Sequence, residues 1–231
     1  MYIEGDYALK GTIVNTAAVI AGSVIGLVAG SRFPGRVKTI LMQALGLSTL
    51  PIGLQMALSI HDIIPTVGCL LLGALTGEML KIEDGLERLA LWLRDRSRSN
   101  SSTFVEGFVA SSLLFCTGAM VIVGSIQDGT KGNAAILYVK AMLDGVASVA
   151  FASTLGIGVV FSAANVLIVQ GTITLLASRL AFLQEPAVLD AVTATGGLLI
   201  VAIGINLLGT TKIRIGNLLP ALVYAIIWAL L

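Results

Sequence analysis

Long apolar stretches separated by short polar segments follow one another along the whole chain. A helix needs about 20 apolar residues to cross the hydrocarbon core of a bilayer. We therefore predict an all-α, multi-pass membrane bundle of about eight transmembrane helices: about 12–31, 37–60, 63–80, 104–126, 134–155, 157–180, 188–208 and 216–231. Seven spans are the alternative, because the sequence Gly156-Ile-Gly158 could make 134–180 one span followed by a broken or re-entrant segment.

One polar segment, 81–103, separates the third and fourth predicted spans. Leu86, Leu89, Ala90 and Leu93 recur within it at helical spacing. This pattern predicts a short amphipathic helix at the membrane interface, followed by a flexible serine-rich linker.

Composition supports a membrane location and excludes several other classes of protein. Only 12% of the residues are charged, against about 25% in soluble domains. The net charge of +1 offers no basic surface for nucleic acid. Cys69 and Cys116 lie in apolar runs, and the chain has one histidine, so we expect neither a disulfide framework nor a metal site nor a cofactor. The first ten residues lack the basic region of a signal peptide, which predicts that the first helix is retained. We predict a single membrane domain, 1–231.

The basic residues orient the predicted spans. Cytoplasmic loops of membrane proteins carry an excess of Lys and Arg. With eight spans, the three most basic loops fall on one side, and they contain Arg32, Arg36 and Lys38, then five basic residues of 81–103, then Lys212 and Arg214. Lys131 and Arg179 are exceptions on the other side. We predict a bacterial inner-membrane protein with its N-terminus outside.

A weak internal repeat appears when the chain is shifted by 151 positions. Gly46-Leu47 then falls on Gly197-Leu198, and Ile52-Gly53 falls on Ile203-Gly204. This predicts repeats 11–80 and 157–231 around the linker 81–103 and the central helices 104–156. The repeats would be inverted, as in many transporters. The alternative is that two glycine-rich helices look alike because both pack closely.

The first helix carries Gly22, Gly26 and Gly30 at spacings of four residues. Small residues at this spacing let another helix backbone approach closely. The contact could lie within one chain or between the protomers of a homodimer.

Ionisable side chains inside the fifth predicted span are the main candidates for chemistry. Lys140 and Asp144 share one face of the helix, and such groups in membranes usually face the bundle interior or a water-filled cavity. Two interpretations remain open: a structural ion pair, or a proton- or cation-linked site. Neighbouring and repeat-related polar residues extend the candidate substrate- or ion-binding set to Asp144, Lys140, Asp128, Gln127, Ser125, Asn15, Asn165, Gln55 and Asn206. Each amide could instead be a hydrogen bond between helices.

Three segments carry a resemblance to a known family: Gly11-Thr12-Ile13-Val14-Asn15, the region from Phe115 to Gly129, and Lys140-Ala-Met-Leu-Asp-Gly145. In these the chain resembles the bacterial inner-membrane domain-of-unknown-function family 554, the YdfK/YqgA-like group. The resemblance implies a multi-span membrane protein and carries over no active residues.

These features favour a small-solute or ion transporter. We expect the lipid bilayer and an unidentified small solute or ion as its partners, and no nucleic acid. An ion channel is an alternative. Another is a structural or regulatory membrane protein that uses 81–103 as a docking site. We expect no enzyme, because no nucleophile elbow, phosphate loop or paired-histidine motif is present.

Overall fold

The computed structural model describes residues 9–58, 63–96 and 103–231, and within these ranges the chain forms helices and no β-strand. The all-α prediction is therefore confirmed. Among the described residues, six helices are long and apolar enough to cross a membrane. They are α1 (Lys10–Gly30), α2 (Gly35–Ala57), α3 (Ile63–Leu80), α7 (Ala135–Leu155), α8 (Gly158–Leu175) and α9 (Pro186–Leu207).

A seventh candidate span consists of two helices, α5 (Phe104–Cys116) and α6 (Ala119–Lys131), which are bent by 60° at their junction. At the C-terminal end, the short helices η2 (Ile215–Leu218) and α10 (Pro220–Ala229) form a shorter apolar stretch. A further 3-10 turn, η1 (Ala181–Gln184), precedes α9.

The break between α5 and α6 corrects the predicted fourth span. That span was expected to run unbroken over 104–126, but α5 ends at Cys116 and α6 runs from Ala119 to Lys131. Gly118 has a φ of 112°, which stops the helix there. At Gly196 of α9, an added methyl group would collide with the Thr117 side chain, so the break sits closely against α9.

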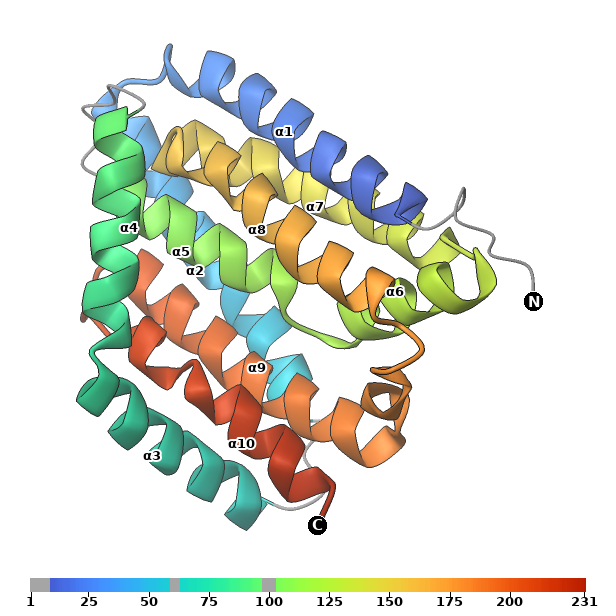
Figure 1. The fold of residues 1–231 in the computed structure, drawn as a ribbon. Coiled ribbons are helices and arrows are strands. Elements are labelled where there is room, and N and C mark those ends of the chain that lie inside the picture. Colours follow the sequence, from blue (N-terminus) through green and yellow to red (C-terminus); the bar gives the residue numbers. More distant parts are fainter. Residues whose placement is uncertain (1–8, 59–62, 97–102) are drawn as a thin grey trace.

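The interruption at 156–158 separates two complete helices. Both α7 and α8 are long enough to span a membrane, so 134–180 is not one span with a re-entrant segment. The turn between them lies at one end of the bundle (Figure 1).

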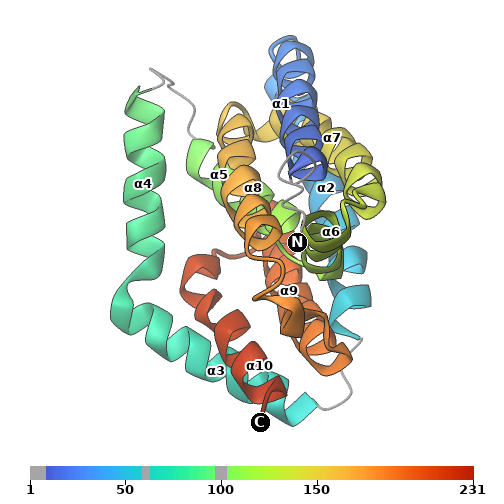
Figure 2. The same cartoon turned by 45° about the vertical axis from the view of Figure 1, so that its right-hand side comes forward.

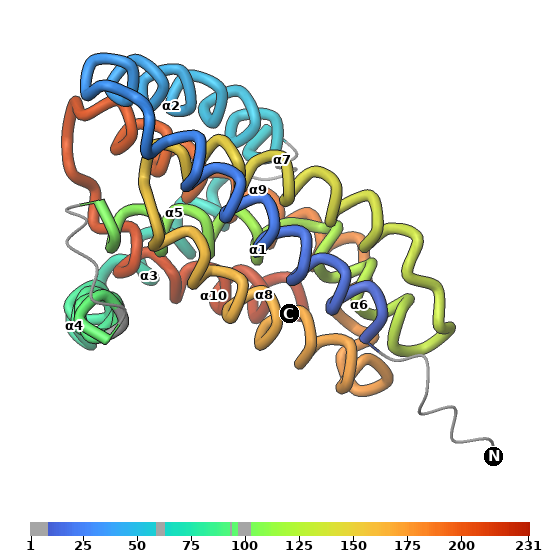
Figure 3. The backbone as a smooth tube through the Cα atoms, turned by 90° about the horizontal axis from the view of Figure 1, so that it is seen from above, coloured from blue at the N-terminus to red at the C-terminus, as the bar shows by residue number. Residues whose placement is uncertain are grey.

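The long helices run in one general direction, and the two ends of the bundle carry different loops (Figures 1 and 3). One end carries the turns 31–34 and 156–157 and the loop 208–214. The opposite end carries the start of α1, the turn 132–134 and the segment 176–185.

The amphipathic helix predicted in the polar segment is α4 (Ile82–Arg96), and it lies across the ends of the other helices (Figure 1). Lys81, with a φ of 52°, turns the chain from α3 into α4. Glu83 ties this corner to η2, because its carboxylate accepts the Gly216 amide at 2.6 Å and its amide donates to Asn217 Oδ1 at 2.7 Å. The predicted linker falls on 97–102, outside the described residues.

The first helix packs along α7, and this contact uses the predicted glycines. A methyl group at Gly22, Gly26 or Gly30 would overlap the backbone carbonyl of Gly145, Val149 or Ser153, respectively. The partner residue advances in step with the glycine, so the two helices are parallel. The tight helix contact is confirmed, and it lies within one chain. Because the glycine row of α1 is used within the chain, it does not support a homodimer, which stays a prediction.

The contact between α2 and α9 has a reciprocal pattern. A methyl group at Gly53 would lie 2.8 Å from the Gly197 carbonyl oxygen, and one at Gly197 would lie 2.7 Å from that of Gly53. Gly46 and Gly204 meet in the same way, at 2.9 and 3.1 Å. Because Gly46 meets Gly204 and Gly53 meets Gly197, the two helices are antiparallel, and each glycine of α2 contacts the repeat counterpart of the other glycine of α2. Figure 2 shows α3 and α10 paired beside this bundle.

Candidate functional site

A buried ion pair on α7 is the starting point of the site. Lys140 Nζ lies 2.8 Å from Asp144 Oδ2 and 2.9 Å from Oδ1, so it contacts both carboxylate oxygens. The two side chains are 7% and 9% exposed. They share a helix face because residues four apart are neighbours on an α-helix. The pair is thus formed locally, before any other helix contributes.

Two amides from other helices join this pair. Asn15 of α1 donates from Nδ2 to Asp144 Oδ2 at 3.0 Å and to Gln170 Oε1 of α8 at 2.9 Å. Asn15 and Gln170 are almost wholly buried. We call Asn15, Lys140, Asp144 and Gln170 the central cluster. It connects three of the candidate spans through charged and amide groups.

A second group of polar residues adjoins the central cluster. Asp128 of α6 accepts the Gly11 amide of α1 through Oδ2, at 3.1 Å. The hydroxyls of Thr12 and Thr174 lie 3.4 Å apart and link α1 to α8. Ser125 lies one turn before Asp128 on α6 and is fully buried. Together with the central cluster, these residues form what we call the polar band.

The polar band extends from one end of the bundle toward its middle. Asn15 is the sixth residue of α1, Lys140 is the sixth of α7, and Gln170 is the sixth from the end of α8, so at 1.5 Å per residue they lie about 8 Å inside the helix ends. Asp144 is the tenth of the 21 residues of α7 and lies near the middle of that helix. The turn between α7 and α8, at Gly156 and Ile157, lies at the opposite end of α7 and contributes nothing to the band.

Three of the predicted amides do not join the band. Asn165 donates to Ser112 Oγ of α5 at 2.8 Å. Asn206 pairs with the Ile213 backbone in both directions, at 2.8 and 2.9 Å, and so fixes the loop after α9. Gln55 is exposed on α2. The expectation of a single polar centre built from repeat-paired amides is therefore wrong. Gln127, on the neighbouring helix α6, is half-buried.

Gln170, Thr12 and Thr174 belong to the band but were not among the predicted site residues. Gln170 was visible as an amide inside an apolar stretch, and Thr174 follows it by one helical turn. Their partners are on α1, more than 150 positions away in the sequence. Spacing along one helix cannot reveal such contacts.

Several buried polar atoms in the band have no hydrogen-bond partner among the described residues. They are Asn15 Oδ1, Gln170 Nε2, Ser125 Oγ and Asp128 Oδ1. Buried polar atoms are nearly always paired, with protein, water or ligand. The band therefore has unused capacity to bind an ion or a polar group. The described residues contain no group of three or more His, Cys, Asp or Glu side chains that could share a metal ion.

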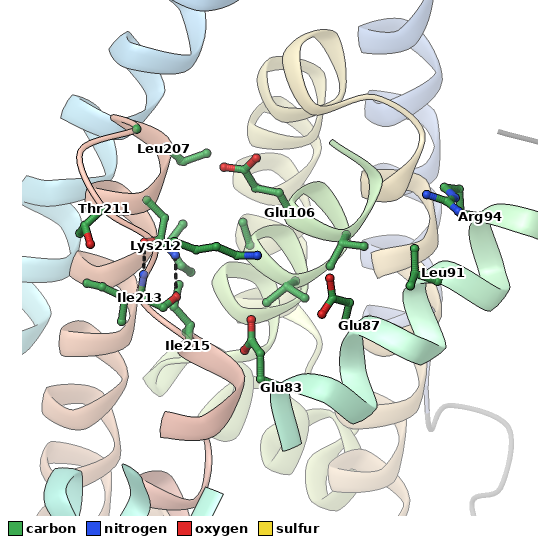
Figure 4. Close-up of a pocket in the computed structure, with 16 residues that line it drawn as sticks. Glu83, Glu87, Leu91, Arg94, Glu106, Leu207, Thr211, Lys212, Ile213 and Ile215 are labelled. Carbon is green, nitrogen blue, oxygen red and sulfur yellow. Dashed lines mark hydrogen bonds between the residues drawn. The ribbon is translucent and has the colours of Figure 1, made fainter. Parts of the chain in front are cut away.

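A separate cavity of about 560 Å³ opens at the other end of the bundle, between α4, α5 and the loop after α9. Figure 4 shows Lys212 extending between Glu83, Glu87 and Glu106 at its wall. The apolar part of the wall comes from α5 and α9, from Leu91 of α4, and from Ile213 and Ile215 after α9. This cavity and the polar band are at different ends of the molecule, so they are two distinct features.

The helices and the buried polar band define a multi-pass, all-helical membrane protein. A family model described as "Protein of unknown function (DUF554)" matches residues 10–230, and the chain belongs to this family.

Two relatives cover nearly the whole chain. The uncharacterised protein YqgA of Escherichia coli K12 is 31% identical over 220 residues, which is 93% of this chain and 94% of that protein. The uncharacterised membrane protein YdfK of Bacillus subtilis 168 is 32% identical over 219 residues, 92% of each chain. No solved structure matches the chain.

Proposed function

We propose that this protein is a small-solute or ion transporter of the bacterial inner membrane, and that the central cluster is part of its transport site. The observation that carries the proposal is the Lys140–Asp144 pair, buried among candidate spans and bonded to Asn15 and, through it, to Gln170. Charged groups inside a membrane bundle are costly and usually mark ion or substrate pathways.

A purely structural role explains this arrangement less well. The contact between α1 and α7 is already made by Gly22, Gly26 and Gly30, which allow close backbone packing without any charge. Replacing a buried ion pair by apolar residues is often neutral or stabilising in proteins. The band also leaves amide, hydroxyl and carboxylate atoms unpaired, which a structural network would not need.

The reciprocal glycine contacts between α2 and α9 support an inverted repeat of α1–α3 and α8–α10. Gly46 meets Gly204, and Gly53 meets Gly197, as expected if a two-fold axis passes between the helices. Inverted repeats allow a carrier to open alternately to either side by rocking one half against the other. In this proposal the α2–α9 contact is the pivot.

The loops at the α4 end carry most of the basic residues, so we place that end in the cytoplasm and the N-terminus outside. The polar band then extends from the outer side of the membrane toward its middle. The cavity beside Lys212 would face the cytoplasm.

The experiment is a transport screen of purified protein in proteoliposomes. Cations, anions, amino acids and carboxylates are tested by solid-supported-membrane electrophysiology, and a lumenal pH dye detects electroneutral proton exchange. We expect a substrate-dependent signal that is lost in Asp144→Asn and kept in Asp84→Asn, which removes an exposed carboxylate on α4. Silence of folded wild-type protein by both methods, or full activity of Asp144→Asn, would contradict the proposal. A steady unitary conductance would identify a channel instead.

A further inference from the structure

Three of the unpartnered atoms in the polar band are oxygens, and this indicates which kind of ligand the band could bind. Asn15 Oδ1 and an ionised Asp128 Oδ1 can only accept hydrogen bonds or bind a cation, and Ser125 Oγ can do so as well. These three residues are at most 1% exposed. Hard cations are held by this set of carboxylate, amide and hydroxyl oxygens.

The three oxygens belong to one region of the fold. Ser125 and Asp128 are three residues apart and so share a face of α6. Asp128 is bonded to the Gly11 amide, and Gly11 lies one helical turn before Asn15 on α1. Side chains of an α-helix tilt toward its N-terminus, which directs Asn15 toward the turn that Asp128 contacts.

The charge of the band indicates the charge of the ligand. Asp128 and Asp144 contribute two negative charges, and Lys140 contributes one positive charge, which leaves a net charge of −1. One monovalent cation would neutralise the band, whereas a divalent cation would leave it positive. Lys10 is left out of this sum, because it is exposed at the start of α1 and water screens its charge.

We propose that the outer end of the polar band, formed by Asp128 and Ser125 of α6 with Asn15 of α1, binds a monovalent alkali cation. In this site Lys140 and Asp144 remain bonded to each other and do not bind the cation. Asn15 belongs both to the cation site and, through its bond to Asp144, to the central cluster. Binding at this position would couple the ion to the central cluster through a shared side chain. The role of the bound cation rests on the proposed transport function, but the binding test described next does not.

The test measures binding in detergent, without any transport step. The thermal unfolding temperature of the purified protein is followed while NaCl or KCl replaces choline chloride at constant ionic strength, at several pH values. Equilibrium binding of radioactive sodium is measured on the same sample. We expect a saturable increase in unfolding temperature with at least one alkali cation and none with choline.

The variants are Asp128→Asn, Ser125→Ala and the control Glu185→Gln, which removes an exposed carboxylate just before α9, at the same end of the bundle. Loss of one charged ligand should weaken the apparent affinity by about tenfold or more, since each 1.4 kcal/mol of binding energy is a factor of ten. We expect Asp128→Asn to weaken cation binding by at least this factor, Ser125→Ala to weaken it less, and Glu185→Gln to leave it unchanged.

Equal stability in sodium, potassium and choline salts at every pH would overturn the proposal, and so would unchanged cation binding by Asp128→Asn. If Asp128→Asn does not fold, Ser125→Ala decides: unchanged affinity in that variant contradicts the site. Cation binding without any transported substrate would support the cation site and contradict the transport proposal. Transport without cation binding would support the transport proposal and contradict the cation site.

Discussion

Lys140 and Asp144 depend on each other more than most neighbouring side chains do. Each is buried, and each neutralises a charge that would otherwise be isolated in an apolar environment. Removing one partner of such a pair leaves an uncompensated charge, while removing both does not. The stability of single and double variants can therefore separate the pair from its surroundings.

We expect Lys140→Met to destabilise the protein by about 3–5 kcal/mol, because Asp144 would stay buried with Asn15 as its remaining donor. The double variant Lys140→Met/Asp144→Leu should recover most of this loss. Differential scanning fluorimetry in detergent gives the comparison. A double variant as unstable as Lys140→Met would mean that the packing of the lysine stem, and not the charge, is responsible.

At the residue scale, the sequence predicted the contacts that form within a single helix. Lys140 and Asp144 are four residues apart, so their pairing follows from helix geometry alone. The Asn15 contact depends on how α1 lies against α7, and no local pattern specifies that register. For the same reason Gln55 and Asn206, which look like Asn15 in sequence, have different surroundings in the structure.

At the scale of helices, the close contact of α1 with α7 positions the site. Gly22, Gly26 and Gly30 bring the two backbones together along much of their length. The alignment of these glycines with successive turns of α7 sets Asn15 opposite Asp144. A larger residue in this row should therefore affect both stability and the central cluster.

We expect Gly26→Ala to lower stability on the order of 1–3 kcal/mol, because its methyl group would overlap the Val149 carbonyl. Gly68→Ala on α3 is the matched control, since a methyl group there meets nothing within 4 Å. Thermal unfolding of both variants in the same detergent checks this. Equal unfolding temperatures would show that α1 can move away from α7 at little cost.

The helices themselves were largely predictable from hydropathy, but their breaks were not. The periodic apolar stretches gave α1, α2, α3, α7, α8 and α9 to within a few residues. The sequence Gly156-Ile-Gly158 was predicted to separate two spans, with a break inside one span as the alternative, and it lies at a turn between two helices. The actual break at Gly118 lies in an apolar stretch, where hydropathy shows no change, and depends on packing against α2 and α9.

At the scale of the whole molecule, the uneven distribution of charge suggests how the bundle lies in a membrane. The helix α4 and the loops beside it form one end, and the start of α1 is at the other (Figure 1). An interfacial helix at the basic end is consistent with a cytoplasmic surface rich in Lys and Arg.

We expect opposite labelling of cysteines placed at the two ends. In a chain with Cys69 and Cys116 replaced by alanine, Lys131→Cys should react with a membrane-impermeant maleimide in intact spheroplasts. Ser31→Cys, exposed at the other end, should react only after permeabilisation. The reverse pattern would place the N-terminus inside, and labelling of both sites in intact spheroplasts would contradict a spanning bundle.

The most direct test of the functional claim uses the double variant Lys140→Met/Asp144→Leu in the proteoliposome assay. This variant removes the charges of the central cluster while keeping its volume and, by the reasoning above, its fold. We expect the substrate-dependent signal of the wild-type protein to disappear in the folded double variant. A full signal from that variant would contradict the claim, because the buried pair would then be a structural feature without a part in transport.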